Sequence, residues 1–205
     1  MFKLTKIFVA GSTGYIGKNV VKYALDNGFD VVTAKRHSDN KPGQLNKKLK
    51  VIKISNNDNN WIADLEKVDV IISCLASRTG EPKDAHLVDY KLNCLLLEKA
   101  KALKCSHFIL LSAICVQKPR LAFQFEKLAF EEELKKSGLN FSIIRPTAYF
   151  KSLSGQIENI KKGKPYVYFG DGQLTQCNPI SEKDLSLYIL SCIKDKTKWR
   201  KILPI

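Results

Sequence analysis

Short apolar runs alternate with longer amphipathic segments along most of the chain. The apolar runs predict strands at residues 7–10, within 28–34, and at 49–54, 68–74, 108–112 and 141–145. Helical periodicity follows at residues 15–26, 85–104, 121–136, 150–162 and 181–193, with a shorter helix at 61–65. Two short strands are expected at 166–169 and 174–177, around a turn at 170–172. Apolar strands separated by helices predict a parallel sheet covered on both faces.

A glycine-spaced turn separates the first predicted strand from the first predicted helix. In the spacing G-x-x-G-x-x-G, Gly11 permits a sharp turn, Gly14 lets the main chain approach a pyrophosphate, and Gly17 lets the helix pack closely on the strand. This order predicts a Rossmann-like, doubly wound α/β fold, although three glycines also occur in an ordinary structural turn. The expected cofactor contacts in the turn are Gly11, Ser12, Thr13, Gly14, Tyr15, Ile16 and Gly17.

The end of the second predicted strand carries positive charge. An acidic residue at this corner would hold a ribose hydroxyl and favour NAD. The sequence instead has Lys35, Arg36 and His37, and a guanidinium such as that of Arg36 can grip a 2′-phosphate. We therefore predict NADPH as the cofactor. The alternative is that Lys35 and Arg36 are ordinary surface cations.

Two further segments follow predicted strands and should lie at the same edge of the sheet. Leu75, Ala76 and Ser77 come after the fourth strand, and Pro146 and Thr147 come after the sixth. Because the carboxyl ends of parallel strands meet at one crevice, we expect both segments to contact the cofactor.

Composition and charge narrow the functional classes. The 205 residues suit a single domain, 1–205, in which we expect residues 147–180 to contribute to the substrate side. The net charge of +14 comes mostly from dispersed lysines without an aromatic and arginine platform, so we expect no nucleic-acid partner. The charge does suit an anionic small-molecule substrate. The oligomeric state stays open.

Targeting signals and metal-ligand patterns are not evident in the sequence. No apolar run approaches the roughly 18–20 residues of a membrane span, so we expect no stable membrane insertion. The location expected is the cytoplasm, or a plastid if a transit peptide has been removed. The six cysteines form no C-x-x-C pair, which predicts reduced, mostly buried thiols. His37, His86 and His107 lack ligand spacing and are expected to be structural or exposed, so no metal site is predicted.

The glycine turn and the alternating elements resemble the short-chain dehydrogenase/reductase superfamily. In that superfamily a Tyr-x-x-x-Lys pair follows the fifth strand, and here the matching positions are Phe123 and Lys127. The resemblance implies that Lys127 holds the nicotinamide ribose, whereas Phe123 cannot donate a proton. The alternative for Lys127 is a solvated lysine on a charged helix.

A closer resemblance is to the divinyl chlorophyllide a 8-vinyl reductases. It rests on residues 73–80, 111–119, 123–127, 145–153, 170–172 and 177–185. It implies an NADPH-dependent reduction of the 8-vinyl group of a magnesium tetrapyrrole, as in chlorophyll biosynthesis. The proton that completes the reduction is expected from Ser112, Lys127 or solvent. Ser112 is equally well read as a plain loop hydroxyl.

The resemblance also includes a departure. Family members continue beyond the position that matches Ile205, which leads us to expect a small, truncated C-terminal substrate lobe. The chain is then either a fragment or a shortened relative. Two other functions stay open: a short-chain reductase or epimerase-like protein with another substrate, and a non-catalytic NADPH sensor or assembly protein.

Overall fold

A seven-stranded parallel sheet forms the centre of the protein. The computed structural model describes residues 5–36, 47–54, 60–167, 171 and 178–205. Within these residues the strand order is β3-β2-β1-β4-β5-β6-β7. The strands are β1 (Lys6–Ala10), β2 (Asp30–Lys35), β3 (Leu49–Lys53), β4 (Val70–Ser73), β5 (His107–Leu111), β6 (Phe141–Arg145) and β7 (Lys201–Pro204). The reversal between β1 and β4 confirms the predicted doubly wound, Rossmann-like fold.

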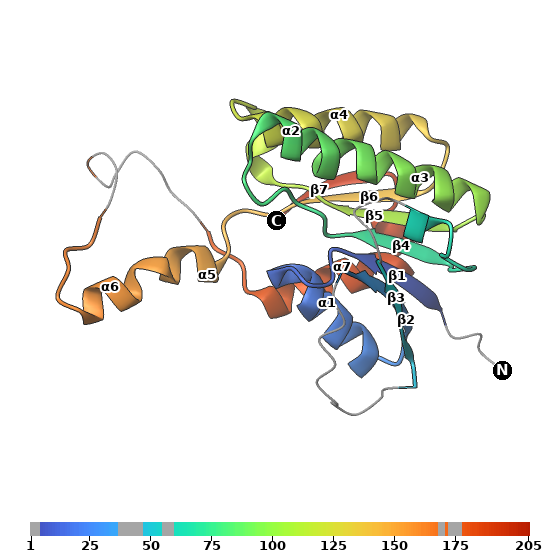
Figure 1. The fold of residues 1–205 in the computed structure, drawn as a ribbon, viewed down its shortest axis with the longest axis horizontal. Helices are drawn as coiled ribbons and strands as arrows, with labels where there is room; N and C mark the ends of the chain where they lie inside the picture. The colour runs from blue at the N-terminus through green and yellow to red at the C-terminus, as the bar shows by residue number, and fades with distance from the viewer. Residues whose placement is uncertain (1–4, 37–46, 55–59, 168–170, 172–177) are drawn as a thin grey trace.

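Helices cover both faces of the sheet (Figure 1). Helix α1 (Tyr15–Asp26) and helix α7 (Glu182–Lys194) lie together on one face. The opposite face carries α2 (Pro82–Ala85), the π-helix η2 (His86–Lys91), α3 (Leu92–Ala102) and α4 (Ala122–Lys136). Short 3-10 helices lie at η1 (Asn60–Ile62), η3 (Ile114–Gln117) and η5 (Lys196–Lys198).

The central strands supply both layers of the core. Phe8 and Phe108 belong to the apolar cluster beneath α3 and α4. Their neighbours Val9 and Ile109 belong to the cluster beneath α1 and α7. Because successive side chains of a strand point to opposite faces, a strand covered on both faces needs apolar residues at nearly every position. This requirement explains the continuous apolar runs in the sequence.

The long helix predicted at residues 85–104 is interrupted. It begins earlier, at Pro82 in α2, passes through the π-helix η2, and ends at Ala102. Proline suits the first turn of a helix because its missing N–H has no partner there in any case. The π-helix widens the segment, and π-turns of this kind occur often at functional sites.

The helix predicted at residues 150–162 is also broken. It is divided into α5 (Phe150–Leu153), the 3-10 helix η4 (Ser154–Gln156) and α6 (Ile157–Lys161). Gly155 lies at the break, where glycine costs a helix about 1 kcal/mol relative to alanine. These elements project from the body of the molecule (Figure 1). Residues 166 and 167 are not in a strand, and the rest of the strands expected at 166–169 and 174–177 lies outside the described residues.

The C-terminal part of the chain contains the predicted helix α7 and a strand that the sequence pattern did not predict. Ser181 precedes α7 and caps it, because its hydroxyl accepts the Asp184 N–H at 3.0 Å. Strand β7 was not predicted. It pairs in parallel with β6 at the sheet edge, where Lys201, Ile202 and Pro204 are exposed and give no apolar alternation. The short helix predicted at 61–65 is the 3-10 helix η1.

His107 is buried at the start of β5. Its Nε2 lies 3.0 Å from the Ser142 hydroxyl, and its ring centroid lies 4.7 Å from that of Trp199. Its Nδ1 has no hydrogen-bond partner among the described residues, so a second ring proton would be buried without an acceptor. Burial lowers the pKa of His107 to about 4.

The free energy of unfolding should therefore fall in mild acid. Unfolded histidine titrates near pH 6.5, so the contribution of neutral His107 is complete above that pH and is lost as the pH falls toward 4. The loss should reach about 3 kcal/mol. We expect His107→Phe, which keeps the ring contact with Trp199, to remove this component. Urea unfolding of both proteins between pH 7.5 and 4 measures it, and a pH-independent difference between them would contradict it.

Candidate functional site

The glycine turn between β1 and α1 has no room for side chains at two of its glycines. Gly11 has a φ of 74°, and a Cβ there would lie 2.6 Å from the carbonyl oxygen of Cys74. A Cβ on Gly17 would lie 2.2 Å from the carbonyl oxygen of Gly11. The Gly14 N–H donates to the Gly11 carbonyl at 3.0 Å and closes the turn. The turn is therefore compact, and its glycines leave the main chain uncovered by side chains where a phosphate would approach.

The predicted turn residues face different directions. Ser12 is buried, and its hydroxyl shares a hydrogen bond with that of Thr33, which also donates to the Val9 carbonyl at 3.2 Å. Ile16 is also buried, in the core beneath α1 and α7. Thr13 and Gly14 are exposed. The exposed pair and the half-buried Gly11 and Tyr15 present surface at the turn.

Tyr15 links the start of α1 to the start of α7. Its hydroxyl donates to Glu182 Oε2 at 2.7 Å, and this hydrogen bond raises the pKa of Tyr15. The Lys151 ammonium lies 4.4 Å from the Tyr15 ring centroid, and the ring of Tyr149 lies 6.4 Å away. The hydroxyl of Tyr15 is thus committed to the protein, a contact that the sequence did not indicate.

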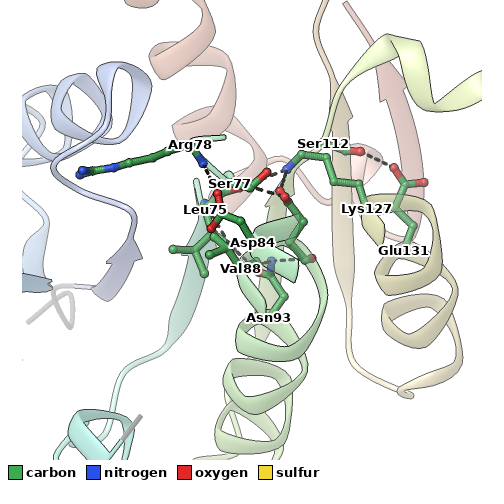
Figure 2. Close-up of polar contacts among 11 residues, drawn as sticks. Leu75, Ser77, Arg78, Asp84, Val88, Asn93, Ser112, Lys127 and Glu131 are labelled. Atoms are coloured by element: carbon green, nitrogen blue, oxygen red, sulfur yellow. Dashed lines mark hydrogen bonds and ion pairs between the residues drawn. The ribbon is translucent and has the colours of Figure 1, made fainter. Parts of the chain in front are cut away.

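Arg36 and the loop that carries Arg78 both come near Asp84. Arg36 directly follows β2 and is exposed, whereas His37 lies outside the described residues. Asp84 holds the loop after β4 by accepting the N–H groups of Arg78 at 2.9 Å and Thr79 at 3.0 Å. The hydrogen bonds from Thr79, and more weakly the charge of Arg36, lower the pKa of Asp84. Figure 2 shows Arg78 extended toward the N-terminal part of the chain, drawn in blue.

Lys127 is buried, with 6% of its surface exposed. Its ammonium forms an ion pair with Asp89 Oδ1 at 2.9 Å and donates to the Leu75 carbonyl at 3.1 Å. The other Asp89 oxygen accepts the Ser77 N–H at 3.2 Å. The interpretation of Lys127 as a solvated lysine is therefore wrong. Lys127 and Asp89 together fasten the loop at residues 75–77 to α4 and to the π-helix (Figure 2).

Asp89 is a site residue that the sequence reasoning missed. Its main-chain carbonyl accepts the Asn93 side-chain amide at 3.0 Å, and Asn93 Oδ1 accepts the Ser73 hydroxyl at 2.6 Å. All three side chains are buried. The signal available in the sequence was a polar pair, Asp89 and Asn93, four residues apart within an otherwise apolar helical stripe.

Ser112 belongs to a second buried polar cluster. Its hydroxyl donates to Glu131 at 2.5 Å, and Arg145 donates to both oxygens of the same carboxylate. Glu131 lies one helical turn beyond Lys127 on α4. The Ser112 proton is therefore directed toward α4, away from the open edge of the sheet (Figure 2). The sequence reasoning did not indicate Glu131 or Arg145.

Tyr149 is a phenol at the carboxyl edge of the sheet. It lies in the stretch 145–153 that carries the family resemblance, but the sequence pattern gave it no role. It packs with Cys74 and Tyr15 against the core beneath α1 and α7. Burial, and secondarily the thiols of Cys74 and Cys115, raise the pKa of Tyr149 to about 12. Its hydroxyl consequently keeps its proton at neutral pH. Burial likewise raises the pKa of Cys74 to about 12, so that thiol stays neutral.

The segment after β6 is held by the end of the chain. Pro146 is buried, and the Thr147 N–H donates to the Ile205 carbonyl at 2.9 Å. The Thr147 hydroxyl donates to the carbonyl of Asn178. The N–H and the hydroxyl of Thr147 are thus both hydrogen-bonded within the protein.

Metal-ligating side chains do not gather in the part of the chain that the structure describes. The cysteines at 74, 94, 105, 115 and 192 are free, and only Cys115 is exposed, while Cys177 lies outside the described residues. His107 is buried, and His86 contacts Glu126 at 3.1 Å. None of the described helices is long and apolar enough to span a bilayer.

A model of a family described as NAD(P)H-binding matches residues 11–196, from the glycine turn to the start of η5. The chain belongs to this NAD(P)H-binding family. Among curated proteins, this family member is 46% identical over 221 aligned residues to the chloroplastic divinyl chlorophyllide a 8-vinyl-reductase of Cucumis sativus. The alignment covers 99% of the chain and 53% of the cucumber protein, so the chain spans about half the length of that relative.

The chain is also similar to a more distant relative and to a solved structure. The NAD(P)H-binding protein is 32% identical to the photosystem II assembly factor Ycf39 of Cyanophora paradoxa, over 73% of the chain and 47% of that protein. Its fold matches the UDP-glucose 4-epimerase of Thermotoga maritima with a TM-score of 0.82, covering 98% of the chain and 76% of the epimerase. The identity to that structure is 19%, so it supports the fold alone.

Removing one partner of the buried pair should destabilise this NAD(P)H-binding protein strongly. Lys127→Met leaves the Asp89 carboxylate buried without its cation, and we expect a loss of about 3–5 kcal/mol in the free energy of unfolding. Asp89→Asn in the same background should restore part of the loss. Lys135→Met on the same helix is the control, because it breaks only a surface pair with Glu132 and should cost about 1 kcal/mol or less. Equal losses for Lys127→Met and Lys135→Met in urea unfolding would contradict the prediction.

Proposed function

We propose that this protein is an NADPH-dependent reductase that acts on the 8-vinyl group of divinyl chlorophyllide a or a close relative of that pigment. The observation that carries the proposal is the relationship to the cucumber 8-vinyl-reductase, at 46% identity over 99% of the chain. The glycine turn and the buried Lys127 give the proposal its structural support.

The described residues fit a dinucleotide. A Cβ on Gly11 or Gly17 would meet main chain, so these two glycines permit the tight turn and the close packing of α1, while the exposed Gly14 leaves the main chain open to a pyrophosphate. No described side chain caps the start of α1, where the peptide dipoles favour negative charge. We assign the phosphates to the main chain of residues 11–17 and the adjoining ribose to the loop at 75–77. The nicotinamide end is assigned to Pro146 and Thr147.

The charge at the end of β2 supports NADPH rather than NADH. Arg36 is exposed, and its charge reaches Asp84 at the base of the loop that carries Arg78. Two guanidinium groups on this side of the turn suit a 2′-phosphate, which they can bind with charge-assisted hydrogen bonds.

Arg36→Gln should therefore weaken NADPH binding while leaving NADH binding nearly unchanged. Loss of one charge-assisted contact should raise the dissociation constant for NADPH by roughly tenfold. The control is Arg200→Gln, which removes an exposed arginine at the start of β7, on the opposite edge of the sheet. Fluorescence titration measures both cofactors. Equal weakening of NADPH and NADH binding would contradict the assignment of Arg36 to the 2′-phosphate.

Alignment is the main task of the protein in this reaction. When bound, NADPH supplies the hydride, and a vinyl group conjugated to a macrocycle can accept it at its terminal carbon. Lys127 does not project freely into the site. It holds the loop at 75–77 through the Leu75 carbonyl and through Asp89, so it acts as a positioning residue.

The proton that completes the reduction needs a donor at the carboxyl edge of the sheet. The Ser112 hydroxyl donates to Glu131 and the Lys127 ammonium is paired with Asp89, so both expected donors are committed. Tyr149 lies at the carboxyl edge and is protonated at neutral pH, although burial raises its pKa to about 12 and makes it a weaker acid than a free tyrosine. We assign proton delivery to Tyr149, with solvent as the group that replaces the proton afterwards.

The substrate side is assigned to the projecting elements. In a single domain of residues 1–205, we propose that residues 147–180 contribute to it. Five large apolar side chains are exposed in the described part of this stretch, and a flat macrocycle could cover them. They are Phe150, Ile157, Ile160, Tyr166 and Val167.

Turnover is the direct test. The protein should convert 3,8-divinyl chlorophyllide a to the 8-ethyl pigment with one NADPH consumed per product, as followed by chromatography and absorbance. Tyr149→Phe should lower kcat by roughly tenfold to a hundredfold, because solvent replaces the phenol only in part. Tyr23→Phe on α1 is the matched control and should leave kcat unchanged. NADPH binding without any conversion of the pigment would refute the proposed activity.

Two observations support a second candidate function, an NADPH-binding assembly factor without turnover. The relative Ycf39 is described as a photosystem II assembly factor, and Phe123 occupies the position of the superfamily tyrosine. Binding of NADPH with no oxidation by any acceptor would favour this function. Oxidation by another acceptor would instead favour a reductase or epimerase-like protein with a different substrate.

A further inference from the structure

A hollow of about 490 Å³ lies beside the carboxyl end of β5, outside the residues assigned to the cofactor. The 3-10 helix η3 forms one wall, and the segment that enters α4 forms the other. This volume falls within the usual range for small-molecule sites, roughly 300–1,000 Å³.

The lining combines two cations with apolar surface. Lys118 and Arg120 are exposed, and neither forms an ion pair within the part of the chain that the structure describes. No carboxylate lines the hollow. Ile114 and the largely exposed Leu121 supply apolar surface beside the charges. The chemistry therefore suits a ligand that is apolar over most of its surface and carries a negative group at one edge.

Gln124 fixes the segment that carries Arg120. Its side-chain oxygen accepts the N–H groups of Arg120 at 2.7 Å and of Leu121 at 3.0 Å. Gln124 is itself buried, with 8% of its surface exposed. The main chain at Arg120 is thus held in place before any ligand arrives, which reduces the entropy lost on binding.

The hollow adjoins the edge where the proposed chemistry would occur. Ile114 lies two residues beyond Ser112, and its N–H donates to the Pro146 carbonyl at 3.0 Å. The same hydrogen bond joins η3 to the segment assigned to the nicotinamide end. A substrate seated in the hollow would therefore reach the carboxyl edge of β5 and β6.

We propose that this hollow binds the carboxylate-bearing edge of the substrate, with Arg120 and Lys118 pairing with the carboxylate and Ile114 and Leu121 packing on the ring. The inference rests on the proposed function, because a chlorophyllide has a free carboxylate where the corresponding chlorophyll has an ester. It makes the free acid, rather than an ester of the same pigment, the preferred ligand.

Pigment binding, measured without NADPH, tests the site independently of turnover. The protein is titrated against divinyl chlorophyllide a and its methyl ester, with pigment fluorescence as the readout. We expect the acid to bind roughly tenfold more tightly than the ester. Arg120→Gln should abolish most of this preference and Lys118→Gln part of it, by weakening binding of the acid alone. Arg200→Gln, just before β7 at the amino end of the parallel strands, should keep the full preference.

The outcomes separate this inference from the proposed activity. Equal binding of acid and ester, absence of pigment binding, or a preference that survives both variants would overturn the carboxylate site. A preference that depends on Arg120, in a protein that never reduces the vinyl group, would support the site and refute the reductase activity. Thermal unfolding of each variant shows whether a lost preference reflects a lost fold.

Discussion

The approach of α1 to the end of β1 leaves no space for a side chain at the turn between them. A Cβ on Gly17 would lie 2.2 Å from the Gly11 carbonyl oxygen, and a Cβ on Gly11 would lie 2.6 Å from the Cys74 carbonyl oxygen. Because Cys74 directly follows β4, this packing also sets the distance between the glycine turn and the loop at 75–77. The glycine turn and the loop at 75–77 form the two main-chain walls of the proposed cofactor crevice. They can lie this close together because Gly11 and Gly17 have no Cβ.

Helix α4 holds the same edge from the other face through two buried charges one turn apart. Lys127 binds Asp89 and the loop after β4, and Glu131 binds Ser112 and Arg145 at the ends of β5 and β6. A buried ion without a partner costs several kcal/mol, so each pair fixes its elements relative to one helix. The result is a rigid edge, which suits a reaction that depends chiefly on alignment.

Local signals made much of the fold predictable from the sequence. The helix at Tyr15–Asp26 and the strand at Phe141–Arg145 match their predicted bounds, and the glycine turn was read directly from its spacing. Side-chain partners were less accessible. Lys127 and Glu131 lie in a helix dense in lysine and glutamate, where residue type alone does not separate solvated charges from buried ones. Strand β7 is an exposed edge strand, so its position depends on β6 rather than on its own pattern.

The contact between Tyr15 and Glu182 joins residues 167 positions apart. Val20 of α1 and Leu185 of α7 belong to the same buried cluster, so the face of the sheet beneath α1 is closed only when α7 packs there. During synthesis the glycine turn emerges before α7, so its apolar surroundings stay open until α7 has been made. Contacts of such long sequence separation also form slowly. The glycine turn is therefore completed only once α7 packs beside α1, and until then the chain exposes apolar surface of the kind that favours aggregation.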